Sequence, residues 1–181
     1  MGRSEPGDTD SCARGDNPVK VKLNSIEKRL AEAVARKRNE NNISNGVTSL
    51  KRSNKSDEDI NVEGMMGEIA YCKAMNLYPD LEVDQVVHPS FDAKYRNGIT
   101  VDVKTHVNYS SSRSGNLLMA TLKTKVIDQD WFALVVGEYP EYEILGHFKS
   151  EDLIDPINID DLGYGNTYVV DMDHPKWKLF S

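Results

Sequence analysis

Alternating side-chain character between residues 91 and 106 predicts a β-hairpin. The stretch reads FDAKYRNGITVDVKTH, and its second half alternates Val101, Val103 and Thr105 with Asp102, Lys104 and His106. Successive side chains of a strand point to opposite faces. We therefore expect one face of this strand to carry the ionisable groups and the other to pack, with Asn97-Gly98 forming the turn.

The face on which Asp92 lies depends on the length of that turn. A three-residue loop over residues 96–98, with Gly98 in the left-handed conformation, sets Asp92 opposite Asp102. A two-residue turn sets it opposite Val103 instead, because a slip of one residue reverses every side chain. We favour the three-residue loop.

Other periodic segments predict a chain of helices and strands. Asn24 and Glu27 form a capping box for a helix over 24–39, with Ile26, Leu30 and Val34 on one stripe. Ser56 caps a second helix that runs toward Met75. Strands are expected over 81–87, 130–139, 142–148 and 167–171, with a short helix from Ser150. The expected fold is α/β, with a central mixed sheet flanked by helices.

Asp92 and Asp102 are candidate metal ligands. Two carboxylates that converge inside a sheet repel each other and are costly to desolvate, so a cation between them is expected. Oxygen ligands of this kind suit Mg²⁺ or Mn²⁺. Lys104 follows two residues later, where it can orient an attacking water or neutralise developing charge on a phosphate.

The chain resembles the PD-(D/E)XK nuclease superfamily at Asp92 and at the run Asp102-Val103-Lys104, which match its D...(D/E)-x-K core. A second match is GMMGEIA at residues 64–70, which is similar to the G-x-x-G-E-x-A pattern of phage-type members. Phe91 stands where many members have proline. The resemblance covers residues 57–148. It implies a restriction-endonuclease-like core and Mg²⁺-dependent hydrolysis of DNA. The implied metal ligands are Glu68, Asp92, Asp102 and the Val103 carbonyl, and Lys104 is the implied water-positioning residue.

The helix that carries this pattern holds two candidate acids. Glu63 and Glu68 lie about 140° apart around the helix, so only one of them can face the hairpin. We select Glu68, which matches the pattern; the alternative is an exposed surface glutamate. Gly64 and Gly67 each cost about 1 kcal/mol in a helix interior, which suggests that close packing requires them.

Charge is unevenly distributed along the 181 residues. The net charge is -7, but residues 20–55 hold ten Lys or Arg against three Glu. Such a basic segment can supply contacts to DNA phosphates, and a solvated surface helix is the alternative. The candidate DNA-contact residues are His106, Arg113, Lys123, Arg36 and Arg38. For His106, a strand-end histidine without a role is the favoured account.

The expected organisation has three parts. Residues 1–18 form a disordered tail, 19–55 a basic helix and linker arm, and 56–181 the nuclease domain. No apolar run approaches the roughly 20 residues that cross a bilayer, and no signal-peptide region is seen. We expect a cytoplasmic protein, in the host cytoplasm if it is viral. Whether it is a monomer or a homodimer stays open.

Two other functions remain. The chain can be a nucleic-acid-binding or assembly protein that keeps the nuclease fold without catalysis. It can also be a small metal-independent domain in which D-x-K is coincidental.

Overall fold

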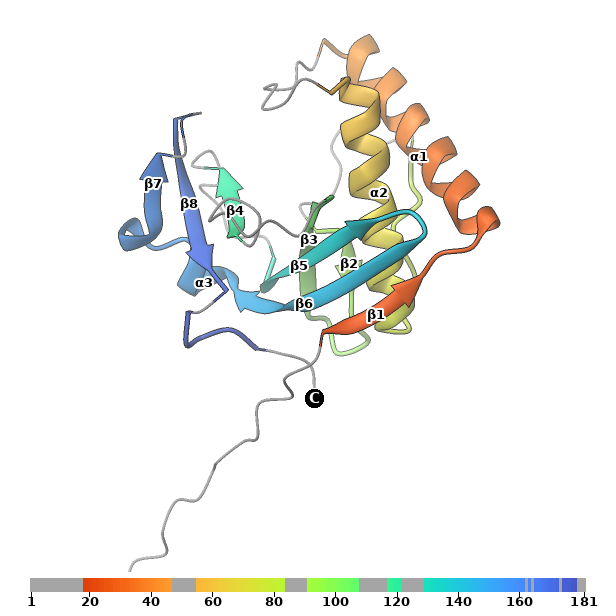
Figure 1. The fold of residues 1–181 in the computed structure, drawn as a ribbon. Helices are drawn as coiled ribbons and strands as arrows, with labels where there is room; N and C mark the ends of the chain where they lie inside the picture. The colour runs from red at the N-terminus through yellow and green to blue at the C-terminus, as the bar shows by residue number, and fades with distance from the viewer. Residues whose placement is uncertain are drawn as a thin grey trace, which may run out of the picture.

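A five-stranded mixed sheet lies at the centre of the fold. The computed structural model describes residues 18–46, 55–83, 91–107, 117–121, 129–161, 163, 165–172 and 174–178, with only the backbone described for 117–121. The strand order is β1-β6-β5-β3-β2 (Figure 1). The strands are β1 Val19–Lys22, β2 Ala93–Lys94, β3 Thr100–His106, β5 Trp131–Glu138 and β6 Glu141–Lys149. β3 runs parallel to β5, and the other neighbours are antiparallel.

A second, three-stranded antiparallel sheet lies beside the first. Its order is β4-β8-β7, with β4 at Leu117–Thr121, β7 at Ile159–Asp161 and β8 at Asn166–Asp171. The chain thus leaves the main sheet after β3, adds β4 to the second sheet, and returns as β5.

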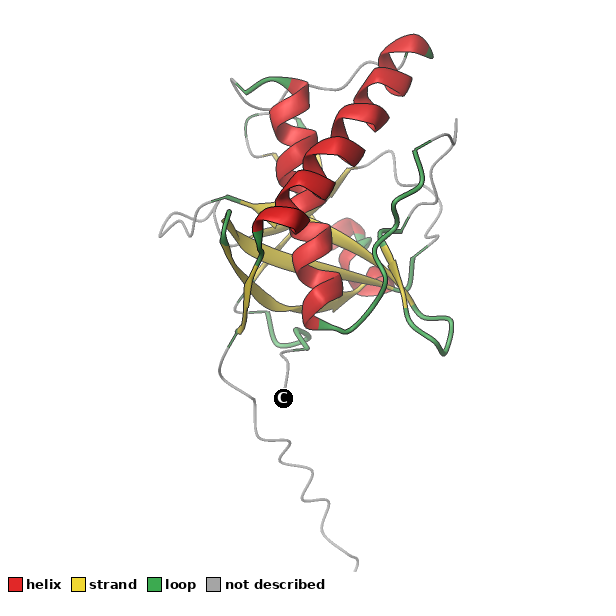
Figure 2. Cartoon of the chain, turned by 90° about the vertical axis from the view of Figure 1, so that its right-hand side faces the viewer, coloured by secondary structure: helices red, strands yellow, loops and turns green. Residues whose placement is uncertain are grey.

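Two long helices cover one face of the main sheet. They are α1, Ser25–Ser44, and α2, Asp57–Ala74, which cross each other in front of the sheet in Figure 2. Their caps explain where they begin: Asn24 and Glu27 exchange hydrogen bonds with each other's backbone N–H, and Ser56 Oγ accepts from Asp59 N. A short helix α3, Ser150–Leu153, and a 3₁₀ turn at Pro156–Asn158 follow β6.

The main sheet is buried on both faces. Its helix side packs α1 and α2 against residues such as Val101, Val103 and Ala133. Its other side packs Phe132 and Phe148 against α3, β8 and Trp177. The expected α/β fold with a central mixed sheet and flanking helices is therefore confirmed.

Residues 19–35, which the sequence assigns to the basic arm, pack into this core. β1 pairs with β6, and α1 buries Ala31, Val34 and Ala35 against α2 and the sheet. The apolar stripe predicted for this helix is only partly right: Val34 is buried, but Ile26 is 67% exposed and Leu30 is 38% exposed. Small alanine side chains let the two helices approach closely, which a search for large apolar residues misses.

The first helix ends five residues later than predicted. Its polar final turns are held by tertiary contacts, since the Asn41 side chain donates to the Val83 carbonyl and the Arg38 side chain donates to the Glu82 carbonyl. Residues 81–83 form no strand, and the rest of the strand predicted over 81–87 lies outside the described residues, as do residues 1–17 of the predicted tail.

Candidate metal centre at the open edge of the sheet

The turn of the β2–β3 hairpin is a three-residue loop. Tyr95 N donates to the Ile99 carbonyl at 2.8 Å, and Gly98 has φ 92°, in the left-handed region. Ala93 pairs with Val101. Continuing this register by one residue sets Asp92 opposite Asp102, as the three-residue loop predicts.

β2 is short, and among the described residues it leaves the outer edge of β3 without a strand partner beyond Val101. It pairs only with Thr100 and Val101. Beyond it, the Asp92 carboxylate takes the place of a strand and accepts a hydrogen bond from Val103 N–H at 2.7 Å. The N–H and C=O of one strand residue point to the same side, so the Val103 carbonyl is directed to this edge too.

The two faces of β3 carry different residues, as the alternation predicts. Gly67 on α2 contacts Thr105, and Val101 and Val103 are in the core on the helix side. Lys104 Nζ lies on the other side, 2.6 Å from Asp102 Oδ1 and 5.7 Å from the centroid of the Phe132 ring. Lysine and aspartate thus form an ion pair within one face of the strand.

Glu68 is brought to β3 by a close helix contact. A Cβ at Gly67 would lie 1.9 Å from Thr105 Oγ1 and 2.8 Å from Thr105 Cβ, so only glycine allows this approach. The neighbouring Glu68 side chain is 14% exposed, whereas Glu63 forms an ion pair with Lys55 at the surface. The inward glutamate is the one predicted. A Cβ at Gly64 would meet no atom within 4 Å, so the packing role expected for this glycine is wrong.

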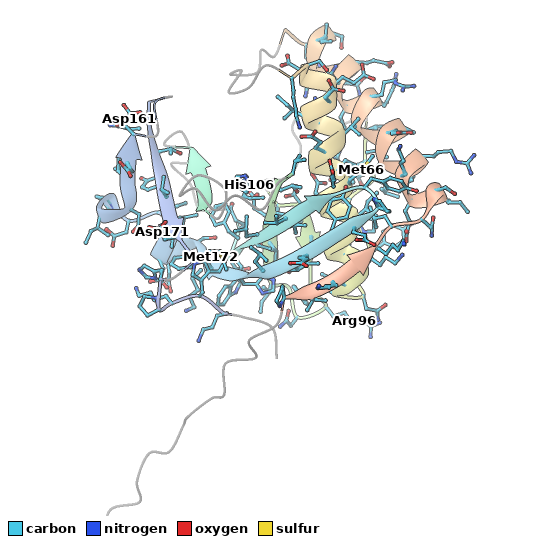
Figure 3. The ribbon with its side chains drawn as sticks, in the orientation of Figure 1. Met66, Arg96, His106, Asp161, Asp171 and Met172 are labelled. Atoms are coloured by element: carbon cyan, nitrogen blue, oxygen red, sulfur yellow. The ribbon has the colours of Figure 1, made fainter. Side chains whose placement is uncertain are left out.

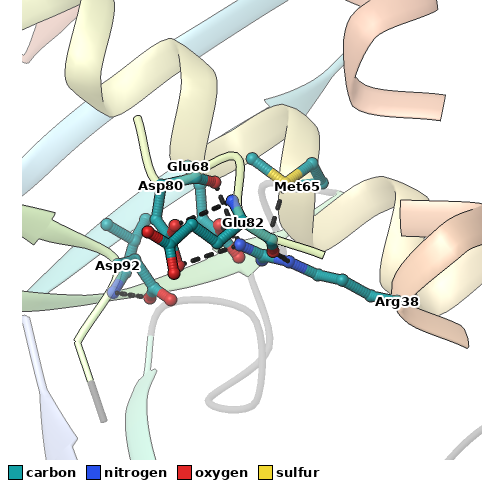
Figure 4. Close-up of polar contacts among 7 residues, drawn as sticks. Arg38, Met65, Glu68, Asp80, Glu82 and Asp92 are labelled. Atoms are coloured by element: carbon teal, nitrogen blue, oxygen red, sulfur yellow. Dashed lines mark hydrogen bonds and ion pairs between the residues drawn. The ribbon is translucent and has the colours of Figure 1, made fainter. Parts of the chain in front are cut away.

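Arg38 from α1 reaches into the same cluster (Figure 4). Its guanidinium lies 3.6 Å from Glu68 Oε2 and 3.0 Å from Asp80 Oδ2, and it donates to the Asp80 and Glu82 carbonyls. The side chain is 17% exposed. Arg38 therefore links α1, Glu68 on α2 and the segment after α2.

These contacts shift the protonation of the carboxylates. Burial, followed by the charge of Asp92, raises the pKa of Glu68 to about 8, although Arg38 acts in the opposite direction. Burial and the charge of Asp102 raise the pKa of Asp92 to about 7. Burial lowers the pKa of Lys104, but the negative charge of Asp102, its ion-pair partner, outweighs burial and the net pKa is raised. Three carboxylates thus repel one another in a site of low solvent access.

The oxygen atoms of Glu68, Asp92 and Asp102 are of the type that hard divalent cations prefer. Each of these carboxylates already contacts a protein group. Glu68 Oε2 and Asp102 Oδ1 are buried and accept no hydrogen bond of good geometry from a described residue; each has an ion-pair contact only. Among the described residues, no three His, Cys, Asp or Glu side chains form a group that could hold a metal ion. Binding would require at least one carboxylate to move away from its present partner.

Three of the five predicted DNA-contact residues are described by the structure, and they have different surroundings. His106 lies at the end of β3 (Figure 3). Arg36 is 63% exposed and pairs with Glu58, whereas Arg38 is inside the carboxylate cluster. Arg113 and Lys123 lie outside the described residues.

Much of the positive charge in the basic segment is paired at the surface. The ion pairs are Lys20–Glu143, Lys22–Glu141, Lys28–Glu32, Arg36–Glu58, Lys37–Glu40 and Lys55–Glu63. Exposed pairs of this kind contribute about 0–1 kcal/mol each, so phosphates can compete for such cations.

Sequence reasoning missed the role of Arg38 and the participation of Asp80. Arg38 lies seven residues after Ala31 and three after Ala35, on the buried stripe of α1. A charged residue at a core-facing helical position predicts a buried acidic partner. Asp80 carries no comparable signal, because it lies in an irregular segment.

Comparison with known proteins identifies the family. In the part of the chain that the structure describes, no helix is long and apolar enough to cross a membrane. No curated protein matches the sequence. The model of a family of unknown function, DUF5843, matches residues 18–171, which include both sheets and the carboxylate cluster. The chain therefore belongs to the DUF5843 family.

Proposed function

We propose that this protein is a divalent-metal-dependent nuclease that hydrolyses phosphodiester bonds in DNA, with a restriction-endonuclease-like core. The observation that carries the proposal is the electrostatic coupling of three buried acids, Glu68 on α2, Asp92 just before β2 and Asp102 on β3, with Lys104 paired to Asp102. Their mutual repulsion has no structural benefit, because a stable core would replace them with apolar or neutral groups.

The arrangement of elements supports the same proposal. The helix with Glu68 is followed by the hairpin of β2 and β3, and β3 then pairs with the apolar strand β5. This is the order that the PD-(D/E)XK resemblance implies. The parallel β3–β5 pair buries the strand that carries Asp102 and Lys104, which holds both side chains on a rigid element.

Glu68, Asp92, Asp102 and the Val103 carbonyl would hold Mg²⁺ or Mn²⁺. A bound cation of this kind supplies Lewis-acid chemistry, lowering the pKa of water and neutralising phosphate charge. The Val103 N–H already fixes the Asp92 carboxylate at 2.7 Å. This hydrogen bond occupies one Asp92 oxygen and leaves the other as the candidate ligand atom.

Lys104 acts as a cationic hydrogen-bond donor. Its raised pKa keeps the ammonium protonated at neutral pH, so it does not serve as a general base. From its position 2.6 Å from Asp102 Oδ1, it can donate to an attacking water or to a phosphate oxygen that gains charge. Asp102 orients this donor and limits its rotation.

The proposal is tested with plasmid DNA and linear single-stranded DNA in Mg²⁺, Mn²⁺ or EDTA. Cleavage should require the cation, and Lys104→Ala should reduce the rate by about 10²–10³-fold, as for loss of one transition-state donor. Lys94→Ala is the matched control, because Lys94 is an exposed lysine of the same hairpin. Cleavage that persists in EDTA, or that survives Lys104→Ala unchanged, would refute the mechanism.

A second function is favoured by the ion pairs within the site. Asp102 is paired with Lys104 and Glu68 with Arg38. Each of these two acids therefore already has a cationic side chain of the protein beside it. This arrangement suits a DNA-binding or assembly protein that keeps the nuclease fold without catalysis. DNA binding by gel shift, with no cleavage in either metal, would select this alternative.

A further inference from the structure

A cavity of about 330 Å³ opens beside the hairpin, on the helix side of the main sheet. Tyr95, Ile99 and Val101 form one wall, and Trp131 and His147 form the other. The walls are aromatic and aliphatic. A volume near the lower end of the range for ligand sites suits one ring system rather than a large molecule.

The two aromatic walls are held by one buried hydroxyl. Tyr71 Oη lies 3.0 Å from Tyr95 Oη and 2.5 Å from His147 Nε2, and Tyr71 is fully buried on α2. The His147 ring also packs edge-on against Trp131, with centroids 6.3 Å apart. The cavity is therefore preformed, which reduces the entropic cost of binding.

The mouth of the cavity is polar and cationic. Asn97 and Lys178 are exposed residues of its lining. Lys149, which pairs with Glu151 and does not line the cavity, lies 5.8 Å from the centroid of the Trp131 ring. Arg96, at the tip of the β2–β3 hairpin, points outward in Figure 3. A ligand that places a ring inside and a negative charge at the mouth matches this distribution.

The cavity is linked to Glu68 of the carboxylate cluster through α2. Tyr71, which holds both cavity walls, is three residues after Glu68, so both side chains lie on one face about one turn apart. Val101 of the lining and Asp102 point to opposite faces of β3, so the cavity and the Asp102–Lys104 ion pair lie on different sides of the strand.

We infer that this cavity binds an unpaired nucleobase of the nucleic-acid substrate, stacked between Tyr95 and Trp131, with an adjacent phosphate at Lys178. The inference rests on the proposed function and adds the substrate class: single-stranded DNA, or DNA with a flipped or unpaired base. A base inside an intact duplex has no free face to place here.

Mononucleotide binding tests the inference without cleavage. The chain has two tryptophans, and Trp177 is buried in the other core, so a base that stacks in the cavity should quench Trp131. The probes are deoxyadenosine monophosphate, deoxyadenosine and inorganic phosphate, all in EDTA. We expect saturable quenching by the first two and tighter binding of the monophosphate.

Three substitutions localise the binding. Trp131→Leu keeps apolar volume and should weaken binding, measured by calorimetry, about five- to 150-fold, the range for loss of one base–aromatic stack. Ile99→Trp fills the cavity and should abolish binding while Tyr95 and Trp131, the two proposed stacking rings, stay in place. Tyr78→Leu is the control, because Tyr78 is 84% exposed and does not line the cavity.

The outcomes separate this inference from the nuclease proposal. Absence of saturable binding, or equal binding by Ile99→Trp, would overturn the base site even if cleavage is observed. If inorganic phosphate at equal concentration displaces the mononucleotide completely, the cavity binds the phosphate and not the base, and the inference is overturned. Mononucleotide binding that survives Lys104→Ala supports the base site, whether or not the wild-type protein cleaves DNA.

Discussion

Substitution of Gly67 by alanine tests how the helix contact builds the site. A Cβ at this position would overlap Thr105 Oγ1 at 1.9 Å, Cγ2 at 2.7 Å and Cβ at 2.8 Å. Rotation of the threonine can move Oγ1 and Cγ2 but not Cβ, so α2 must shift away from β3. Overpacking of this kind costs about 1–3 kcal/mol. The shift would also carry Glu68 away from Asp92.

Gly64→Ala is the matched control for this experiment. Both glycines are interior residues of α2, so both variants gain about 1 kcal/mol of helix propensity. Only Gly67 meets a neighbour. The gain in helix propensity is the same in both variants and cancels in the comparison. The free energy of unfolding of Gly67→Ala, measured in urea, should therefore be about 1–3 kcal/mol lower than that of Gly64→Ala.

Thr105→Ala provides the internal check. It removes the two closest atoms and leaves the Cβ contact at 2.8 Å, so it should recover part of the stability lost in Gly67→Ala. Equal stability of the two glycine variants, or no coupling between positions 67 and 105, would show that the helix does not depend on this contact.

Three more predictions follow from the buried charges. Arg38→Met leaves Glu68 unpaired and should lower the free energy of unfolding by about 3 kcal/mol, whereas Arg36→Met, at an exposed pair, should change it by less than about 1 kcal/mol; urea unfolding measures both. Asp92→Asn removes repulsion with Asp102 and should raise the free energy of unfolding by about 0.5–2 kcal/mol, while the nuclease proposal expects it to abolish cleavage; a less stable variant would contradict the electrostatic reasoning. Burial lowers the pKa of His147 to about 4, below its unfolded value near 6.5, so the stability that it contributes is present above pH 6.5 and is lost as pH falls toward 4. Between pH 7 and pH 5 the free energy of unfolding of the wild type should fall by about 2 kcal/mol more than that of His147→Asn. If the two proteins lose stability in parallel over this pH range, the lowered pKa of His147 is contradicted.

The hairpin was predictable from sequence because its determinants are local. Gly98 sets the loop, and the period of two then assigns Asp92 and Asp102. Helix geometry showed that only one of Glu63 and Glu68 can face the hairpin, and the G-x-x-G-E-x-A pattern then selected Glu68. In each case the deciding interaction lies within a few residues of the side chain that it places.

The remaining features depend on partners that are distant in the chain. β1 is a strand because β6 offers an edge to its four residues, and nothing within them specifies that partner. α1 continues to Ser44 because Asn41 reaches Val83. The inward direction of Arg38 likewise depends on Asp80, forty-two residues later. Local propensity holds no information about such contacts.

The pairing of β1 with β6 bears on how the protein is made. Val19 is synthesised long before its partner Ile144. Loop closure over such a separation is slow, and the main sheet cannot be completed until Ile144 has been made. A chain that stops before β6 would therefore lack the strand on which β1 pairs, and its β1 segment would stay without this partner.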